Sequence, residues 1–360
     1  MEAPGVLTRL GSSLGGSPRL RRGDTVNLGV IAAGVLFVLL ALPSLMTPYW
    51  VTISMAAVPY GIVALGLGVL IGRVGMISLG QIAVLALGAW VGSKLLFSTS
   101  LPYPIVLLLT GLITAVLGTI IGLPALRVSG LYLALVTLML AAAINVVLTD
   151  TNVPNGGPGF LGYNDISTGT PPSIRRPSIA LSDTSFFRYI VIVAVLMFAL
   201  TLWHIRGKPG RAWAAIRQSE PAALAAGVNV TLYKLWAFAL ASFITGVAGA
   251  LLGSASHLLY NYQFPTSQSI ELFAVVLMGG VYTMWGAIVA MVLFQILPAA
   301  LTIWGIPNDW ATILFGIGIL QVLTTAPAGI AHQMPRDLGR LARLIFGLAK
   351  RVAPASGRAP

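Results

Sequence analysis

The sequence predicts an all-α membrane protein, a polytopic bundle of about 8–10 transmembrane helices with both termini in the cytoplasm. Of the 360 residues, 57% are hydrophobic and only 8% are charged, whereas soluble chains have about 25% charged residues. A chain with so few charges cannot cover a water-facing surface, which excludes a soluble enzyme. In addition, uncharged apolar stretches of about 20 residues, the length of one membrane crossing, recur along the chain.

These uncharged stretches place the first six spans. Residues 25–72 lack Asp, Glu, Lys and Arg and are long enough for two helices, with the break predicted at Pro43–Pro48. Three further spans are predicted over 74–93, 95–126 and 128–149. The polar stretch that follows, rich in Gly, Pro and Ser, is expected to form an external loop over about 150–187. A sixth span is predicted over about 189–205.

Most of the 21 Lys and Arg residues gather in three hydrophilic stretches, the tail 1–24, the segment 206–234 and the tail 331–360. Basic residues beside apolar spans mark the cytoplasmic side of a membrane. Six spans from a cytoplasmic N-terminus return the chain to the cytoplasm at 206–234, in agreement with this rule. The net charge of +12 is therefore a signal of topology rather than of nucleic-acid binding.

Between the segment 206–234 and a cytoplasmic C-terminal tail, the number of crossings must be even. Four apolar stretches fit, at about 235–257, 269–281, 286–304 and 311–327. The second is short and ends at Gly279-Gly280, so we expect a re-entrant or broken helix there. The transmembrane domain as a whole is predicted over 25–330. In the C-terminal tail, apolar residues at helical spacing favour a helix on the cytoplasmic leaflet, with a frayed tail as the alternative.

The sequence offers no cluster for catalysis or metal binding, and we predict neither. No Lys stands in the Gly-Lys-Ser/Thr string of a P-loop, the chain has no Cys, and its His and acidic residues are isolated from one another. Glu271 is an acidic residue at the start of an apolar stretch. We expect it in the first turn of a helix, where the dipole stabilises a carboxylate and the hydroxyls of 266–269 cap; a place in a transport path is the alternative.

The segment 206–234 has the most informative pattern in the chain. It is rich in Ala, which favours helix, but Pro221 disfavours helix at the preceding residue and suits the first turn of a new one. We expect one helix over about 211–218, a corner at Ser219–Glu220, and a second helix over 221–226 that ends at Gly227. Two short angled helices with small surface residues form a compact docking surface; an ordinary loop between spans is the alternative.

The string Glu220-Pro221-Ala222-Ala223, followed by Gly227, resembles the EAA loop of ABC-transporter permeases, which inserts into a cleft of the cytoplasmic ATPase. Pro221 occupies the acidic position of that pattern, and Glu220 is displaced by one residue. The wider string 210–235 is similar to the LivM-type permeases of branched-chain amino-acid importers. Four further segments resemble that family in its order, namely 72–89, 122–138, 155–159 and 269–286. The resemblance covers about residues 55–330.

The resemblance implies a permease subunit of an ABC importer in the bacterial plasma membrane. It would form the pathway together with a sister permease, bind cytoplasmic ATPase subunits through 206–234, and receive its substrate from an extracytoplasmic binding protein. Because the ATPase subunits hydrolyse the ATP, this chain would need no cofactor. The candidate residues for ATPase coupling are Arg211, Arg217, Glu220, Ala222, Ala223 and Gly227.

In membrane helices, Gly-rich stretches mark close packing or backbone exposed to a cavity. The candidate pathway-lining residues are therefore Ser78, Gln81, Glu271, Gly279 and Gly280, with tight helix packing as the alternative. Branched-chain amino acids are the substrates that the resemblance implies, while related permeases for urea, short amides or other amino acids share the same strings. A secondary transporter acting alone and an intramembrane enzyme are two further hypotheses; the enzyme would require a reactive cluster.

Overall fold

The computed structural model describes residues 33–125, 130–150, 174–256, 259–260, 263–307, 309–325 and 329–331. The chain divides into two compact units, one up to Thr47 and one from Pro48 onward. In the first unit, residues 33–40 are helical and α2 spans Leu42–Leu45. The predicted tail 1–24, the string 155–159 and the tail after Ala331 lie outside the described residues.

The second unit begins with α3 (Pro48–Gly68), the π-helical turn η1 (Val69–Val74), α4 (Gln81–Ser98), α5 (Tyr103–Ala125), α6 (Leu131–Asp150) and α7 (Asp183–Arg206). Two short helices, α8 (Lys208–Gln218) and α9 (Glu220–Ala225), precede α10 (Val230–Ser256). The remaining helices are α11 (Ser267–Gly279), α12 (Trp285–Met291), the π-helical turn η4 (Val292–Ile296), α13 (Leu297–Ile303) and α14 (Asp309–Thr325).

Among the described residues, seven helical stretches are long and apolar enough to cross a membrane: α3 with η1, α4, α5, α6, α7, α10, and the stretch from α12 through α13. This confirms the predicted all-α polytopic bundle. The total of 8–10 crossings and the cytoplasmic location of both termini stay predictions. The 13 residues of α11 extend about 20 Å, less than the hydrocarbon thickness of about 30 Å, in agreement with the short helix expected there.

Several predicted boundaries shift, for identifiable backbone reasons. The break expected at Pro43–Pro48 is confirmed, since α2 ends at Leu45 and α3 begins at Pro48. The span expected from 74 begins instead at Gln81, because Gly75 adopts a left-handed conformation (φ 85°) that ends η1, and the residues up to 80 are not helical. Likewise, α4 continues to Ser98 and α5 starts at Tyr103. The turn between these two spans therefore falls later than position 94, where the charge of Lys94 predicts it.

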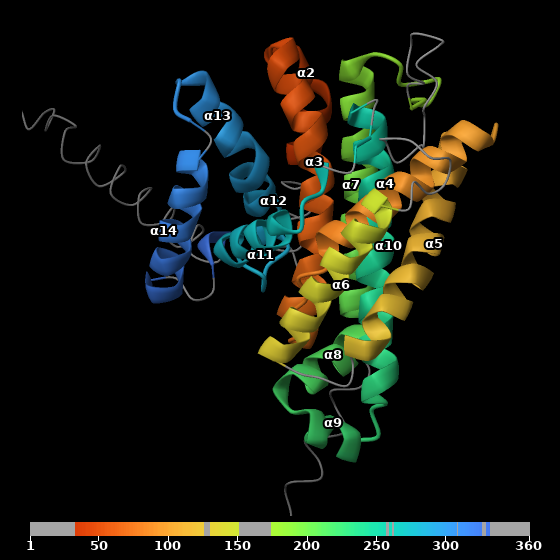
Figure 1. Cartoon of the computed structure of the whole chain (residues 1–360), viewed down its shortest axis with the longest axis vertical. Coiled ribbons are helices and arrows are strands. Elements are labelled where there is room, and N and C mark those ends of the chain that lie inside the picture. The colour runs from red at the N-terminus through yellow and green to blue at the C-terminus, as the bar shows by residue number, and fades with distance from the viewer. Residues whose placement is uncertain are drawn as a thin grey trace, which may run out of the picture. The chain divides into compact units, whose positions relative to one another are not determined.

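In the second unit, α10 is the central helix and packs against α3, α4 and α5 (Figure 1). At its crossing with α4, backbone meets backbone: a Cβ atom on Gly88 would lie 2.6 Å from the Cα of Gly246, and one on Gly249 would lie 2.4 Å from a carbonyl oxygen of α4. The spacings Gly88-x-x-x-Gly92 and Gly249-x-x-x-Gly253 are the small-x-x-x-small pattern of closely packed membrane helices.

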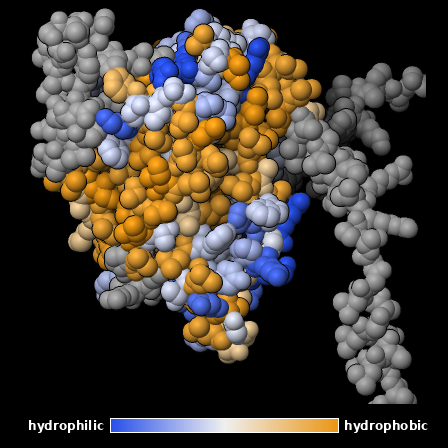
Figure 2. Space-filling view, turned by 90° about the vertical axis from the view of Figure 1, so that its right-hand side faces the viewer, coloured by the Kyte–Doolittle hydropathy of each residue, from blue (hydrophilic) through white to orange (hydrophobic). Residues whose placement is uncertain are grey.

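The outer face of α5 is apolar and exposed, as expected of a helix that faces lipid. Figure 2 shows a broad hydrophobic band across one side of the molecule, with hydrophilic residues gathered above and below it. On the opposite face of α5, a Cβ atom on Gly118 would lie 2.0 Å from the hydroxyl of Ser242 in α10. The exposed aliphatic residues of α5 are Ile105, Leu108, Leu112, Ile113, Val116, Ile120 and Leu123.

We predict that Gly249→Leu destabilises the protein by about 3 kcal/mol or more, because the new side chain must push α10 away from α4. The thermal midpoint of the purified protein and its level in the membrane measure this effect. Gly316→Leu is the matched control, because nothing lies within 4 Å of a Cβ atom added at that position of α14. Equal thermal midpoints for the two variants would contradict the close α4–α10 contact.

Candidate functional site

The two short helices α8 and α9 and the break between them are as predicted, except that α8 begins at Lys208 and Glu220 is the first residue of α9 rather than part of the corner. Helix α8 ends at Gln218, and Ser219 caps α9 by accepting a hydrogen bond at its Oγ from the amide of Ala222 (3.4 Å). Gly227 adopts a left-handed conformation (φ 79°) just past the end of α9. The signals that predict this corner are local: a cap residue, a proline in the first turn and a glycine after the last turn. The backbone follows each of them.

Two contacts fix this corner to the start of α10. Trp213 is fully buried, and its indole N–H donates a 2.8 Å hydrogen bond to the carbonyl of Tyr233. The Nζ of Lys234 pairs with Oε1 of Glu220 at 2.6 Å, with the Lys234 side chain buried and that of Glu220 half exposed. Ala223 is buried as well, with 2% of its surface accessible. Both short helices are therefore held against α10 rather than hanging from a loose linker.

The far side of α9 is an exposed surface of small and apolar residues. Leu224 at its centre is 59% exposed. Of the residues predicted for coupling, Ala222 and Gly227 belong to this surface, whereas Ala223 faces the bundle. An exposed apolar patch on a well-anchored corner is typical of a surface that binds a partner. We call it the α9 surface; it consists of Pro221, Ala222, Leu224, Ala225, Ala226 and Gly227.

The two predicted arginines of α8 lie differently. Arg211 is exposed near the start of the helix. Arg217 points back toward the bundle: its Nη1 donates a 2.7 Å hydrogen bond to the carbonyl of Gly72, and its guanidinium lies over the ring of Tyr282, 4.4 Å from the ring centre. The structure thus gives both Arg217 and Glu220, which were predicted as charged contacts to a partner, partners within the chain.

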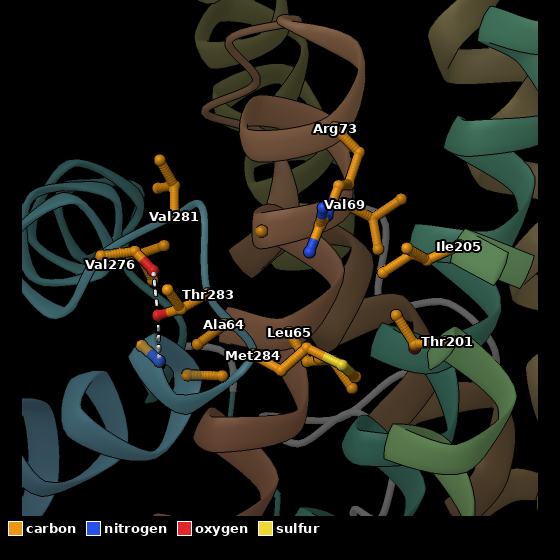
Figure 3. A pocket seen from close by; sticks show the side chains of 14 residues that line it. Ala64, Leu65, Val69, Arg73, Thr201, Ile205, Val276, Val281, Thr283 and Met284 are labelled. Atoms are coloured by element: carbon orange, nitrogen blue, oxygen red, sulfur yellow. Dashed lines mark hydrogen bonds between the residues drawn. The ribbon is translucent and has the colours of Figure 1, made fainter. Parts of the chain in front are cut away.

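A pocket opens beside this contact, between α3, α7 and the turn that joins α11 to α12 (Figure 3). Arg73 extends toward it from η1, and its Nη2 donates a 3.3 Å hydrogen bond to the carbonyl of Tyr282. In the turn, Thr283 accepts a hydrogen bond from the amide of Gly286 at 3.2 Å. Gly280, a predicted pathway residue, lines this pocket. Gly279 packs against α12, where an added Cβ would lie 2.4 Å from a carbonyl oxygen.

Of the other predicted pathway residues, Ser78 and Gln81 are buried and Glu271 is half-buried in this conformation. Ser78 and Gln81 are 2% and 3% exposed, and Gln81 accepts a 2.8 Å hydrogen bond from the hydroxyl of Thr245 in α10. Glu271 is half-buried in the second turn of α11, not in the first turn as predicted, because the helix begins at Ser267. The predicted cap is also wrong, since Thr266 makes no side-chain capping hydrogen bond.

A second pocket lies between α4, α6 and the start of α11. Most of its walls are aliphatic or aromatic, from residues such as Ile82, Ile144 and Phe264. Its polar residues are Asn145, Thr266 and Ser269, and the Ser269 hydroxyl is buried without a hydrogen-bond partner among the described residues. Asn145, which was not among the predicted pathway residues, donates a 3.2 Å hydrogen bond to the carbonyl of Phe264, and an amide inside an apolar span is a sequence signal that could have drawn attention to it.

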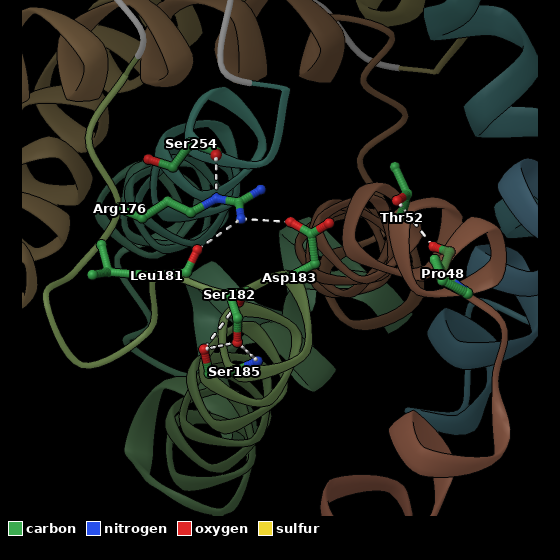
Figure 4. Close-up of polar contacts among 8 residues, drawn as sticks. All are labelled: Pro48, Thr52, Arg176, Leu181, Ser182, Asp183, Ser185 and Ser254. Carbon is green, nitrogen blue, oxygen red and sulfur yellow. Dashed lines mark hydrogen bonds and ion pairs between the residues drawn. The ribbon is translucent and has the colours of Figure 1, made fainter.

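At the opposite end of α10, two arginines hold the chain before α7 in place, and Figure 4 shows the contacts of one of them, Arg176. Arg175 donates to the carbonyls of Leu96 (2.8 Å) and Thr99 (2.7 Å) at the end of α4. Arg176 donates to the carbonyl of Ser254 at the end of α10 (3.3 Å) and pairs with Asp183 (2.6 Å). Carbonyls at helix ends lack partners within their own helix, and these arginines supply them.

Comparisons with known proteins support the family resemblance that the sequence motifs indicated. A family model described as the permease component of the branched-chain amino acid transport system matches residues 49–323. The high-affinity branched-chain amino acid permease LivM of Salmonella typhimurium is 28% identical over 330 residues, 86% of this chain and 76% of LivM. LivM of Escherichia coli is 27% identical with the same coverage, and the autoinducer 2 import permease LsrD of Escherichia coli is 29% identical over 77% of this chain and 83% of LsrD. No solved structure matches the chain.

Proposed function

The chain belongs to the family of permease components of the branched-chain amino acid transport system, which are ABC importer permeases, and we propose that it translocates branched-chain amino acids that an extracytoplasmic binding protein delivers. The similarity to the two LivM proteins supports this substrate. Because LsrD imports autoinducer 2, family membership alone leaves several substrate classes open. The chain is a multi-pass membrane protein, and its pathway would be completed by a sister permease.

The α9 surface is the observation on which the coupling proposal rests. It lies in the segment that the basic residues assign to the cytoplasm, and it presents small apolar residues on a corner anchored by Trp213 and the Glu220–Lys234 pair. Shape should matter more than charge here, since exposed ion pairs contribute only about 0–1 kcal/mol. We therefore assign ATPase docking to Ala222, Leu224 and Gly227, with Arg211 as a charged contact beside them.

The pocket between α4, α6 and α11 has room for no more than about one water molecule in this conformation. Only the chemistry of its lining, and not its size, therefore supports an aliphatic amino acid over a sugar as the substrate. A sugar needs hydrogen-bonding groups around its whole ring, whereas this pocket has polar groups only at Asn145, Thr266 and Ser269. Aliphatic walls with a few placed polar groups suit a ligand that is apolar at one end. The proposed pathway residues stay Ser78, Gln81, Glu271, Gly279 and Gly280. Ser78, Gln81 and Gly279 are buried in this conformation, so substrate would reach them only in another one.

We predict that Gly227→Glu abolishes uptake while the protein remains in the membrane. The substitution puts a side chain at φ 79°, where only Gly and, less often, Asn or Asp are comfortable, and adds charge to the α9 surface. An added Cβ meets no atom within 4 Å at this position, so the bundle itself is undisturbed. Gly227→Asn is the control and should retain most uptake; normal uptake by Gly227→Glu would refute the docking assignment.

We predict that cells with the complete importer take up radiolabelled leucine, that unlabelled isoleucine and valine compete with it, and that galactose, urea and acetamide do not. The physical reason is the aliphatic lining described above. Competition by urea or a short amide, with none by valine, would assign the chain to the alternative substrate class. Uptake that persists after deletion of the ATPase genes would instead indicate a transporter that acts alone.

A further inference from the structure

Three segments that are distant in the sequence meet at Tyr282. Arg217 from α8 lies over the Tyr282 ring and hydrogen-bonds the Gly72 carbonyl, while Arg73 from η1 donates to the Tyr282 carbonyl. Tyr282 belongs to the turn between α11 and α12, and 40% of its surface is exposed. One arginine thus holds the ring of this turn and another holds its backbone.

The segments that meet at Tyr282 are closely packed. A Cβ atom on Gly72 would lie 1.9 Å from the carbonyl oxygen of Val281, so η1 and the turn touch through their backbones. A Cβ atom on Gly75 would lie 3.4 Å from Cγ of Arg217, so the arginine stem packs against the chain just beyond η1. A displacement of α8 therefore cannot be absorbed at this point without moving either η1 or the turn.

From this arrangement we propose that Arg217 is a coupling residue, which transmits movement of the docking corner to the turn between α11 and α12 through the Tyr282 ring and the Gly72 carbonyl. The proposal rests on the proposed function of the α9 surface, because ATPase binding supplies the movement. Helix α8 can transmit it as a rigid unit, since Trp213 and Ile216 are buried against the bundle. The role assigned to Arg217 is thus to position the turn and not to contact the ATPase.

The turn is suited to relay such a movement to the pathway. It joins α11, which is too short to cross the membrane, to α12. Gly279 at the end of α11 and Gly286 in α12 let the two helices touch. Val276 of α11, Met284 of the turn and Ala287 of α12 also line the pocket of Figure 3. A shift of Tyr282 would therefore move α11 and α12 together and change the pocket between them and α3.

The test separates docking from coupling in the complete importer, purified through a tag on this chain and reconstituted in proteoliposomes. Three quantities are measured: the ATPase subunits retained, ATP hydrolysis with and without loaded binding protein, and leucine uptake. For both Tyr282→Leu and Arg217→Gln we expect full retention of the ATPase. Arg217→Gln removes the hydrogen bond to the Gly72 carbonyl together with the ring contact, and we expect uptake per ATP hydrolysed lower by about tenfold, the factor for one lost hydrogen bond to a charged group. Tyr282→Leu removes only the cation–π contact, and we expect uptake per ATP lower by about threefold. The double variant should be no worse than Arg217→Gln, because Arg217→Gln already removes the contact with the Tyr282 ring.

Two controls keep the test sharp. Tyr282→Phe retains the ring and should transport like the natural protein, and Arg206→Gln removes a positive charge from the nearby end of α7 without touching the turn. Normal uptake per ATP by Tyr282→Leu would overturn the proposal, as would loss of the ATPase subunits from Arg217→Gln, which would make Arg217 a docking residue. A natural chain that retains no ATPase would instead overturn the proposed function on which the inference depends.

Discussion

The close contact of α10 with its neighbours is the constraint on which the rest of the bundle depends. In lipid, apolar side chains on neighbouring helices gain little by meeting, so helices associate where small residues let their backbones approach. Gly246, Gly249 and Gly253 supply that approach toward α4, and the α5 glycines supply it from the other side. Because every backbone polar group must also be paired within the protein, α10 stays unbroken over its 27 residues, about 40 Å.

The length of α10 lets it reach past the membrane core and meet polar contacts at both ends. At one end, Lys234 and the carbonyl of Tyr233 hold the docking corner. At the other, Arg176 bonds the carbonyl of Ser254. These contacts connect the corner, through one rigid helix, to the face that would receive substrate. Coupling in this protein would thus use two routes, α10 through the centre and the Tyr282 contact at the periphery.

Features that depend on neighbouring residues could be predicted from the sequence, whereas contacts between residues far apart in the chain could not. The α8–α9 corner followed from Ser219, Pro221 and Gly227, which act within one turn of helix. By contrast, the late start of α4 depends on a left-handed Gly75 that composition does not reveal. The contacts of Arg175 and Arg217 join residues far apart in the chain, so no spacing rule finds them. The hydrogen bond from Arg217 to the Gly72 carbonyl is therefore a contact that the sequence did not predict.

The central claim, that the α9 surface binds the ATPase, is tested most directly by cross-linking, which the absence of native Cys makes clean. Leu224→Cys places a thiol on the α9 surface, and Ile179→Cys places one on a still more exposed site in the chain before α7 (exposures of 59% and 79%). With a short bifunctional reagent in native membranes, we expect an ATPase adduct from Leu224→Cys and none from Ile179→Cys. An ATPase adduct from Ile179→Cys alone would contradict the account.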